Sequence, residues 1–332
     1  MQYNQFGKLG NKSRLGLGTM RLPVNADGSV NEDEAIRLIR LAIDGGINYV
    51  DTAYPYHGGA SEVTVGKALK DGYREKVTLT TKLPCWKVEK REDMDAILDE
   101  QLRRLDLPYV DMYLLHALDI GRYRKMRELG YKEFFESALK DGRIRHVGFS
   151  FHDEKDAFLE IIDDFDAWEM AQIQFNYLDD ESQATEAGLK YAGRKNIPIV
   201  VMEPLRGGNL AALPGNVRAL TEAYPVKRGA VEWAFRYVAD YEEVKVILSG
   251  MSTMEQVKEN LKLFEVMKPG NLSDSDRALL RDMKADFLSR QIVPCTGCEY
   301  CQPCPKGVKI PDIFSAVNQA SMFERQEAFE KR

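Results

Sequence analysis

The stretch 48–56, N-Y-V-D-T-A-Y-P-Y, combines a short apolar lead-in with an aspartate at position 51 and a tyrosine five residues later. This pattern predicts a strand that ends in the Asp51 carboxylate, followed by a loop that carries the Tyr56 phenol. In a barrel of parallel strands, the loops after the strands open onto one face, and the active site lies there. We therefore expect other strands to deliver polar side chains to the same face.

Apolar runs and amphipathic helical patterns alternate on both sides of this stretch. The helix predicted over 31–45, for example, starts with a capping box of Asn31 and Glu34. Eight strands are predicted, each followed by a helix: 15–22, 47–51, 77–82, 110–116, 144–150, 170–174, 197–202 and 244–249. Units of about thirty residues favour a closed α/β (β/α)8 TIM barrel over an open doubly wound sheet. The charged run 123–132 is predicted to be a solvated loop over the barrel mouth.

The composition of the chain restricts its function class. The chain has 332 residues, a net charge of -6, a pI near 5.5 and no long basic run, so we expect no nucleic-acid binding. The first residues hold no apolar core of signal-peptide length, and no stretch approaches 18 uninterrupted apolar residues. We therefore expect neither export nor a membrane span, but a cytoplasmic protein.

Three ionisable side chains fall at the C-terminal ends of consecutive predicted strands: Asp51, Lys82 and His116. Neighbouring strands lie roughly 5 Å apart, so these groups should meet on one rim, with Tyr56 above them. A lysine charge beside a phenol favours the phenolate, and we expect Lys82 to lower the Tyr56 pKa. Tyr56 would then protonate a carbonyl oxygen that His116 binds, while a nicotinamide cofactor delivers hydride to the carbon.

A simpler interpretation exists for each residue alone. Asp51 and Lys82 then form a structural ion pair, Tyr56 is an ordinary loop residue, and His116 is a hydrogen-bonded strand-end histidine. The coincidence of all four groups on one barrel rim favours the catalytic interpretation.

Four motifs together resemble the aldo-keto reductase family. They are D-T-A-x-x-Y at 51–56, a looser G-x-x-S-E-x-x-x-G-K-A-L at 58–69, T-K at 81–82 and D-M-Y-L-L-H at 111–116. The resemblance covers roughly residues 10–266. It implies a (β/α)8 barrel that reduces carbonyls reversibly with NAD(P)H and has no Rossmann domain. It also implies that Tyr56 is the proton donor, that Lys82 and Asp51 tune it, and that His116 orients the carbonyl.

The resemblance also implies where a nicotinamide ring is held. Family members hold its carboxamide after strands five and six, where this chain has Ser150 and Gln172. Phe151 stands where the family often has asparagine, and Met202 stands where a tyrosine commonly stacks on the ring. The Met202 thioether either covers the ring or simply packs in the core. The predicted cofactor contacts further include Gly18, Thr19, Met20 and Asp51.

Two later segments are predicted to bind the cofactor phosphates. The loop 203–209 is either a generic turn or a segment whose glycines let backbone amides approach a pyrophosphate; its predicted contacts are Glu203, Leu205 and Gly207. The segment 249–260 resembles the family's adenosine-phosphate segment and contributes Gly250, Ser252, Gln256, Glu259 and Asn260. Ser252 with Glu255 also predicts a capping box. Many NADP-preferring members carry a basic residue near Gly250 and Gln256, so NADP or NAD stays open, with NADP favoured by family habit.

The C-terminal part contains a run of cysteines, C-T-G-C-E-Y-C-Q-P-C-P over 295–305. It closely resembles the bacterial ferredoxin motif, C-x2-C-x2-C-x3-C-P, although the last gap here is one residue shorter. Cys295, Cys298 and Cys301 are predicted ligands of a [4Fe-4S] cluster, with Cys304 as the fourth. A zinc site usually needs two C-x2-C pairs further apart, so zinc is the weaker alternative.

We expect residues 1–268 to form the barrel and residues 269–332 to form a helical, cysteine-rich extension. The predicted function is NAD(P)H-dependent reduction of an aldehyde or ketone. The alternatives are an iron-sulfur electron-transfer or redox-sensing protein that serves a partner protein, and a non-catalytic barrel like the potassium-channel β subunits that keep cofactor binding.

Overall fold

The computed structural model describes residues 1–293 and 301–324 of the chain. Within these residues, eight parallel strands close into a barrel in the order β10-β3-β4-β5-β6-β7-β8-β9. The barrel strands are β3 (Leu15–Gly18), β4 (Tyr49–Asp51), β5 (Thr78–Pro84), β6 (Val110–Leu118), β7 (Ile144–Phe151), β8 (Ala171–Gln174), β9 (Ile199–Met202) and β10 (Val244–Ser249). This confirms the predicted (β/α)8 barrel.

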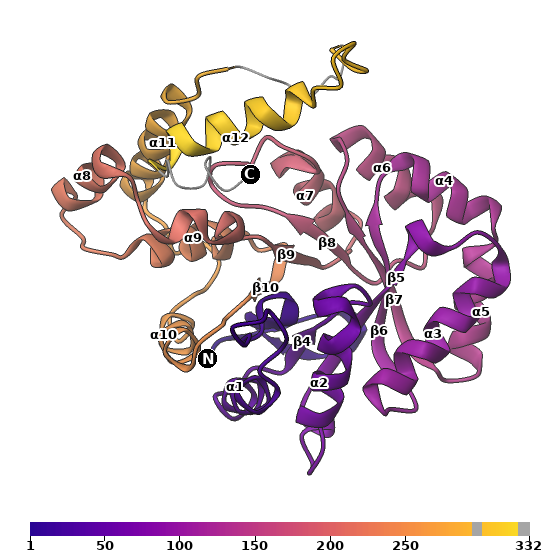
Figure 1. The fold of residues 1–332 in the computed structure, drawn as a ribbon. Coiled ribbons are helices and arrows are strands. Elements are labelled where there is room, and N and C mark those ends of the chain that lie inside the picture. Colours follow the sequence, from indigo (N-terminus) through magenta and orange to yellow (C-terminus); the bar gives the residue numbers. More distant parts are fainter. Residues whose placement is uncertain (294–300, 325–332) are drawn as a thin grey trace. The chain divides into compact units, whose positions relative to one another are not determined.

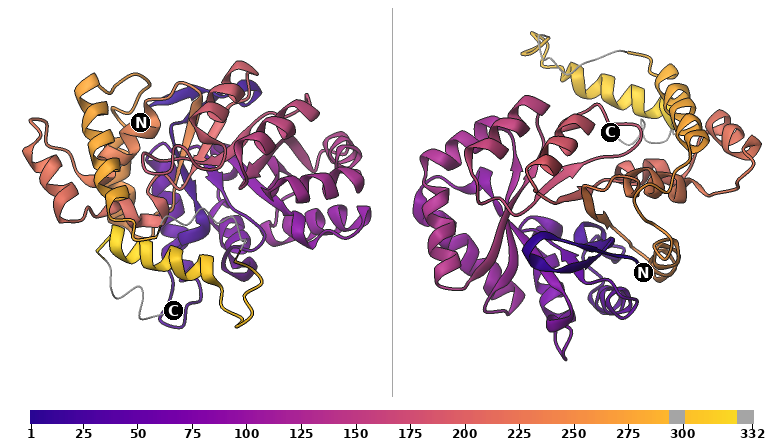
Figure 2. Two further views of the ribbon diagram at one scale, coloured as in Figure 1. Left: turned by 90° about the horizontal axis from the view of Figure 1, so that it is seen from above. Right: turned by 180° about the vertical axis from the view of Figure 1, so that it is seen from behind.

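Helices surround the strands in Figure 1, and Figure 2 shows the same ring from two further directions. Those of the barrel are α1 (Glu32–Asp44), α2 (Ala60–Ala68), α3 (Arg91–Leu105), α4 (Ile120–Glu128), α5 (Tyr131–Lys140), α6 (Lys155–Asp164), α7 (Thr185–Arg194) and α10 (Met254–Leu263). Asn31 is the N-cap of α1 as predicted, since its side chain accepts a hydrogen bond from the Glu34 N–H. The reciprocal half of the predicted capping box is not formed, because the Asn31 N–H donates to the Pro23 carbonyl instead.

The prediction of a loop over 123–132 is wrong, because α4 and the start of α5 occupy this run. Asp119 caps α4 by accepting a hydrogen bond from the Arg122 N–H at 2.7 Å. Tyr123 and Met126 are both fully buried, three residues apart on one helical face. The many charges of the run hid this narrow apolar stripe.

A short antiparallel hairpin of β1 (Tyr3–Gln5) and β2 (Asn11–Ser13) precedes the barrel and was not predicted. Phe6, in its connection, is fully buried and its ring lies 6.0 Å from that of Tyr49 on β4. These two rings belong to a core cluster inside the barrel together with Met112, Leu114, Met170, Val200, Val246 and Leu248. The polar N-terminal piece therefore contributes to the barrel core.

By their internal contacts, the residues divide into two compact units. The first comprises 1–175, 179–204 and 238–271 and includes all barrel strands; the second comprises 176–178, 205–237 and 272–332. In the second unit lie α8 (Gly215–Ala223), α11 (Asp274–Ser289), α12 (Ile310–Met322) and most of α9 (Ala230–Ala239). Its own apolar core includes Trp233, Met283 and Phe287. The predicted boundary at residue 268 stays a prediction.

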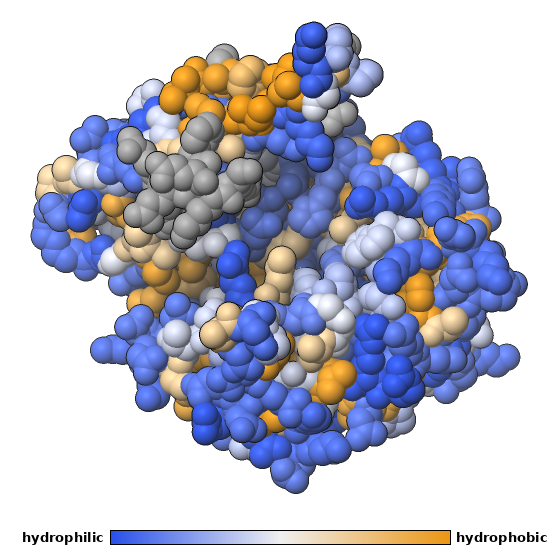
Figure 3. All heavy atoms as spheres, viewed as in Figure 1, coloured by the Kyte–Doolittle hydropathy of each residue, from blue (hydrophilic) through white to orange (hydrophobic). Residues whose placement is uncertain are grey.

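The helices α2, α3 and α5 present mainly hydrophilic side chains on the face drawn in Figure 3. On the same face, hydrophobic side chains gather over α12, in which Ile313 is 45% exposed. No helix in the described residues is long and apolar enough to cross a membrane.

Candidate active site

Asp51 and Lys82 form a buried ion pair near the C-terminal ends of β4 and β5. The Lys82 Nζ donates to Asp51 Oδ1 and to the Thr52 carbonyl oxygen, each at 2.7 Å. The exposed fractions of the two side chains are 0% for Lys82 and 3% for Asp51. Burial by itself lowers the pKa of the Lys82 ammonium, but Asp51 and Tyr56 outweigh burial and raise this pKa above its ordinary value. Lys82 therefore holds a positive charge at neutral pH.

Tyr56 begins the short helix η3 (Tyr56–Gly59), and the Lys82 Nζ lies 5.1 Å from the centre of its ring. Burial raises the pKa of Tyr56, the Lys82 charge and hydrogen bond lower it, and Asp51 and Glu203 raise it again. The net shift is upward, so the predicted lowering is wrong as a net effect, because burial destabilises the phenolate more than Lys82 stabilises it. The phenol keeps its proton at neutral pH, and Lys82 stabilises the phenolate left by proton donation.

His116 lies in β6 with its ring edge-on to the Tyr56 ring, at a centroid distance of 6.3 Å. Burial, followed by the nearby charges of Lys82, His152 and Arg122, lowers the pKa of His116 well below its ordinary value. Its Nδ1 is buried and has no hydrogen-bond partner among the described residues. A neutral imidazole of this kind can donate a hydrogen bond to a carbonyl oxygen without carrying charge. The structure thus brings together all four predicted catalytic residues.

Ser150 on β7 and Gln172 on β8 are direct neighbours in the strand register, and both are buried. The Gln172 Nε2 donates to the Met202 Sδ at 3.8 Å, whereas its Oε1 is buried without a hydrogen-bond partner among the described residues. The Ser150 Oγ accepts from the Ala117 N–H at 2.8 Å, so its hydroxyl hydrogen can still be donated. A free acceptor beside a hydroxyl donor suits a carboxamide, and these contacts stay predictions.

The three predicted contacts after β3 differ in what they offer a ligand. The hydroxyl of Thr19 is fully buried, donates to the Asp51 carbonyl at 3.0 Å and pairs with Ser61 Oγ at 2.8 Å. Gly18 lies close to β10, because a Cβ there would be 3.7 Å from the Ser249 carbonyl oxygen. The Met20 side chain is 62% exposed. Thr19 thus anchors the loop to the Asp51 strand, and Met20 is the accessible member.

The predicted capping box of Ser252 and Glu255 is wrong by one position. Thr253 is the N-cap of α10, and its hydroxyl accepts from the Gln256 N–H at 3.3 Å. Ser252 instead donates its hydroxyl to the Arg21 carbonyl at 2.7 Å and its N–H to Gln256 Oε1 at 2.8 Å. Thr253 has the extended backbone that lets a side chain reach over the first helical turn.

Of the other predicted contacts of this segment, Gly250 lies against an arginine to which sequence analysis assigned no role. Gly250 lies against the Arg21 side chain, since a Cβ there would be 3.2 Å from Arg21 Cδ. The Asn260 Nδ2 is buried and donates to Ser249 Oγ at 3.2 Å, whereas Glu259 is exposed. The aliphatic part of a basic side chain from the segment after β3 therefore lies against Gly250.

The predicted pyrophosphate loop is divided between the two units. Glu203 belongs to the barrel unit, where its charge acts on Tyr56, whereas Leu205 and Gly207 belong to the second unit. Gly207 and Gly208 have positive φ values of 65° and 96°, a backbone conformation that glycine adopts without strain. The glycines are thus required by the turn itself, and their role in phosphate binding stays a prediction.

Two of the four predicted cluster ligands are described. Cys301 is exposed and Cys304 is half-buried, and both are free thiols. Cys295 and Cys298 lie outside the described residues. Among the residues that the structure does describe, no group of three or more His, Cys, Asp or Glu side chains could hold a metal ion. The iron-sulfur assignment therefore stays a prediction.

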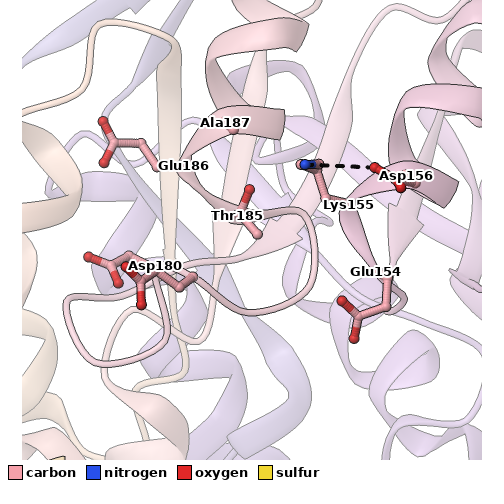
Figure 4. A pocket seen from close by; sticks show the side chains of 8 residues that line it. Glu154, Lys155, Asp156, Asp180, Thr185, Glu186 and Ala187 are labelled. Carbon is pink, nitrogen blue, oxygen red and sulfur yellow. Dashed lines mark ion pairs between the residues drawn. The ribbon is translucent and has the colours of Figure 1, made fainter.

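A hollow of about 520 Å³ opens at the loops after β7 and β8 (Figure 4). Its lining carries mainly carboxylates, and the Lys155 Nζ lies 3.7 Å from Asp156 Oδ1. The lining residues are Glu154, Lys155, Asp156, Asp180, Glu181, Thr185, Glu186 and Ala187. None of the predicted site residues lines this hollow.

A model of the aldo/keto reductase family matches residues 14–278 of this chain, which include all four residues of the buried cluster. The chain belongs to the aldo-keto reductase family. The Bacillus subtilis aldo-keto reductase YhdN is 35% identical over 160 residues, an alignment that covers 45% of this chain and only 47% of the relative. The NADH-specific methylglyoxal reductase of Escherichia coli is 28% identical over 325 residues, covering 84% of this chain and 96% of the relative.

Solved aldo-keto reductases share the fold. The holo form of AKR11C1 from Bacillus halodurans superimposes with a TM-score of 0.70 at 26% identity, over 85% of this chain and 96% of that one. The barrel and its strand order are therefore those of the family.

Further groups lie beside the site, and sequence analysis assigned no role to two of them, Arg122 and the Thr52 carbonyl. The Trp86 ring lies 5.1 Å from the His116 ring and 5.9 Å from the Arg122 guanidinium. Arg122 Nη1 donates to the Ala117 carbonyl at 2.7 Å, next to His116. Arg122 directly precedes the charged run 123–132, which was predicted to be a loop, and nothing in the local sequence indicated this contact. The Thr52 carbonyl, adjacent to Asp51, belongs to the backbone, so no pattern of side chains predicts its contact with Lys82.

We expect Asp51→Asn to destabilise the protein by about 3–5 kcal/mol, because it leaves the buried Lys82 ammonium without its counter-charge. The double variant Asp51→Asn/Lys82→Met should lose less than Asp51→Asn alone, since both charges are then absent. Urea unfolding of the three proteins measures this. A double variant that is no more stable than Asp51→Asn would contradict a charge-balanced pair.

The His116 pKa leads to a pH dependence of stability. Because its folded-state pKa is lowered, the unfolded chain binds more protons below a pH of about 6.5, and stability falls as the pH drops towards the folded pKa. The loss for one such group reaches at most about 1.4 kcal/mol per pH unit. In urea unfolding from about pH 7 to about pH 5, His116→Gln should therefore lose less stability than the wild type. An equal loss would show that His116 does not titrate differently in the folded state.

Proposed function

We propose that this protein reduces an aldehyde or ketone with a nicotinamide cofactor and that Tyr56 donates the proton. The observation that carries this proposal is the buried set of Tyr56, Lys82, Asp51 and His116 at adjacent strand ends of an aldo-keto reductase barrel.

The chemistry follows from the protonation states of these groups. His116, kept neutral by burial, donates a hydrogen bond that orients the carbonyl oxygen. Tyr56, kept protonated by burial, gives its proton to that oxygen. Lys82 then stabilises the phenolate, and Asp51 fixes the Lys82 ammonium in position. The same groups run the reverse reaction, in which the phenolate accepts the proton of an alcohol.

Tyr56, Lys82, Asp51 and His116 are called the tetrad below. The residues around the tetrad fit a nicotinamide, which supplies hydride when bound. Gln172 Oε1, buried without a hydrogen-bond partner among the described residues, would accept from the carboxamide N–H. Ser150 would donate its hydroxyl hydrogen to the carboxamide oxygen, and the Met202 thioether would lie against the ring. The remaining predicted contacts would hold the ribose and phosphates.

We favour NADP(H) over NAD(H) on the position of Arg21. Its side chain packs against Gly250 in the segment that resembles the family's adenosine-phosphate site. A guanidinium there suits the extra phosphate of NADP, since arginine binds phosphate in a bidentate fashion. NAD(H) stays the alternative, in line with the similarity to the NADH-specific methylglyoxal reductase of Escherichia coli.

Tyr56→Phe should lower kcat for carbonyl reduction by about 10³, the size of a typical general-acid contribution, while nicotinamide affinity changes little. The measurement is steady-state NADPH and NADH oxidation on a panel of aldehydes and ketones that includes methylglyoxal, with cofactor binding followed by fluorescence. Tyr73→Phe is the matched control, because it removes a phenol that bonds to Asp44 outside the site. Unchanged turnover in Tyr56→Phe would refute the assigned proton donor.

We further propose that residues 269–332 form an extension to the barrel of residues 1–268 and that Cys295, Cys298, Cys301 and Cys304 hold a [4Fe-4S] cluster. The spacing of the four cysteines supports this, as does the accessible, unpaired state of Cys301 and Cys304. Free thiols of this kind persist in a reducing compartment, so we propose a cytoplasmic location.

Anaerobically purified protein should contain about four iron and four sulfide per chain, with a visible absorption band that Cys298→Ser removes. Absence of iron in the anaerobic wild-type protein would refute the cluster. Addition of NADPH or NADH then decides its role. A cluster that stays oxidised is a structural element of the extension.

A cluster that bleaches on addition of nicotinamide favours the second candidate function, transfer of electrons through the cysteine run to a redox partner protein. Tight cofactor binding without turnover of any carbonyl would instead favour a non-catalytic barrel.

A further inference from the structure

Glu62 on α2 is a fully buried carboxylate that the proposed chemistry does not use. Its Oε1 accepts hydrogen bonds from Thr81 Oγ1 at 2.8 Å and Gln101 Nε2 at 2.7 Å. Its Oε2 accepts from Arg104 Nη1 at 3.1 Å, and the Arg104 side chain is 15% exposed. A buried charge persists only when it is paired and hydrogen-bonded, as Glu62 is.

One arm of this cluster reaches Lys82. The Gln101 Nε2 also lies 3.0 Å from the Lys82 carbonyl oxygen and 3.0 Å from Thr81 Oγ1. The Gln101 Oε1 accepts from the Tyr113 hydroxyl at 2.7 Å, which fixes the orientation of the amide. Strand β5 is thus tied to α3 at the backbone of Lys82 itself.

The other arm reaches the segment that carries Tyr56. Arg104 Nη1 donates to the Tyr54 carbonyl at 3.2 Å, and the guanidinium lies 4.1 Å from the centre of the Tyr54 ring. At the other end, a Cβ on Gly59 would lie 2.8 Å from Arg104 Nη1, so the guanidinium rests against the backbone there. Arg104 therefore contacts both ends of 54–59.

The segment 54–59 needs such support because its backbone is unusual. His57, Gly58 and Gly59 have consecutive positive φ values of 51°, 64° and 97°. The left-handed region is unfavourable for a residue with a Cβ such as His57, and it persists when surrounding contacts hold it. Tyr56 directly precedes this run, so any relaxation of the run moves the phenol.

We propose, resting on the proposed function above, that Glu62, Gln101 and Arg104 form a positioning network that holds the Tyr56 hydroxyl against the Lys82 ammonium. Glu62 is the centre of this network, because its carboxylate bonds both to Gln101, which contacts Lys82, and to Arg104, which contacts the segment that carries Tyr56. None of the three touches the reacting atoms. Their substitution acts on turnover only through Tyr56 and Lys82.

A double-mutant cycle tests this. Arg104→Met should lower kcat at least about tenfold, with the cofactor dissociation constant and the carbonyl KM nearly unchanged, as for a lost transition-state interaction. In the Tyr56→Phe background, measured by single turnover, Arg104→Met should cause no further loss, since the group it positions is already absent. Glu62→Gln should behave in the same way. Arg104→Lys should be faster than Arg104→Met because it keeps the charge, but slower than the wild type because it lacks the forked donors of the guanidinium.

Arg103→Met is the matched control, because Arg103 is the exposed neighbour of Arg104 on the same helix. It should leave kcat unchanged in both backgrounds. If Arg104→Met or Glu62→Gln lowered kcat by the same factor with and without the Tyr56 hydroxyl, the network would be merely structural, and the proposal would be overturned.

Hydrogen exchange separates this proposal from the proposed function. In the structure the Tyr56 N–H bonds to the Ala53 carbonyl and the Gly58 N–H to the Pro55 carbonyl, each at 3.1 Å. These amides should exchange at least about tenfold faster in Arg104→Met and in Glu62→Gln, with the other barrel amides unchanged. If the wild type reduces no carbonyl, the proposed function fails and this readout alone decides: unchanged exchange in both variants overturns the network.

Discussion

The buried ion pair of Asp51 and Lys82 is the constraint on which the site depends. A lysine ammonium without exposure to water persists only beside a counter-charge and hydrogen-bond acceptors, which Asp51 and the Thr52 carbonyl supply. The pair forms because β4 and β5 are parallel neighbours with Asp51 opposite Thr80, two residues before Lys82 on the same strand face. A register shift of one residue would turn Lys82 to the other face. The strand register of the closed barrel therefore fixes the position of the buried ion pair as well as that of the apolar core.

Burial sets the protonation states around this pair. The same low-dielectric surroundings raise the Tyr56 pKa and lower the His116 pKa, so the acid stays protonated and the histidine stays neutral. The positive charge of Lys82 opposes the effect of burial on the Tyr56 pKa and reinforces the effect of burial on the His116 pKa, where Arg122 acts in the same direction. The position of the Lys82 charge thus affects the two pKa values in different ways, and this difference underlies the roles proposed for Tyr56 and His116.

The two compact units carry different parts of the predicted apparatus. The barrel unit contains the tetrad and the predicted contacts from β3, β7, β8, β9 and β10, together with Glu203. The second unit contains Leu205 and Gly207, together with Cys301 and Cys304 of the cysteine run, and it has its own apolar core. The four catalytic candidates and the predicted carboxamide contacts, Ser150 and Gln172, therefore lie in one unit, and the two described cysteines lie in the other.

The sequence by itself determined the alternation of strands and helices, the barrel and the four catalytic candidates, because periodicity and strand ends are local properties. Prediction from the sequence failed in three places. The many charges of 123–132 hid α4, and the N-terminal hairpin lacks a strong apolar run. The sign of the Tyr56 pKa shift depends on burial, which distant parts of the chain create. Only the tertiary structure decided that Arg21 stands beside Gly250 and that Glu62 joins α2 to Gln101 and Arg104 on α3. These contacts join residues 39 or more positions apart, and no local pattern encodes which distant side chain meets which.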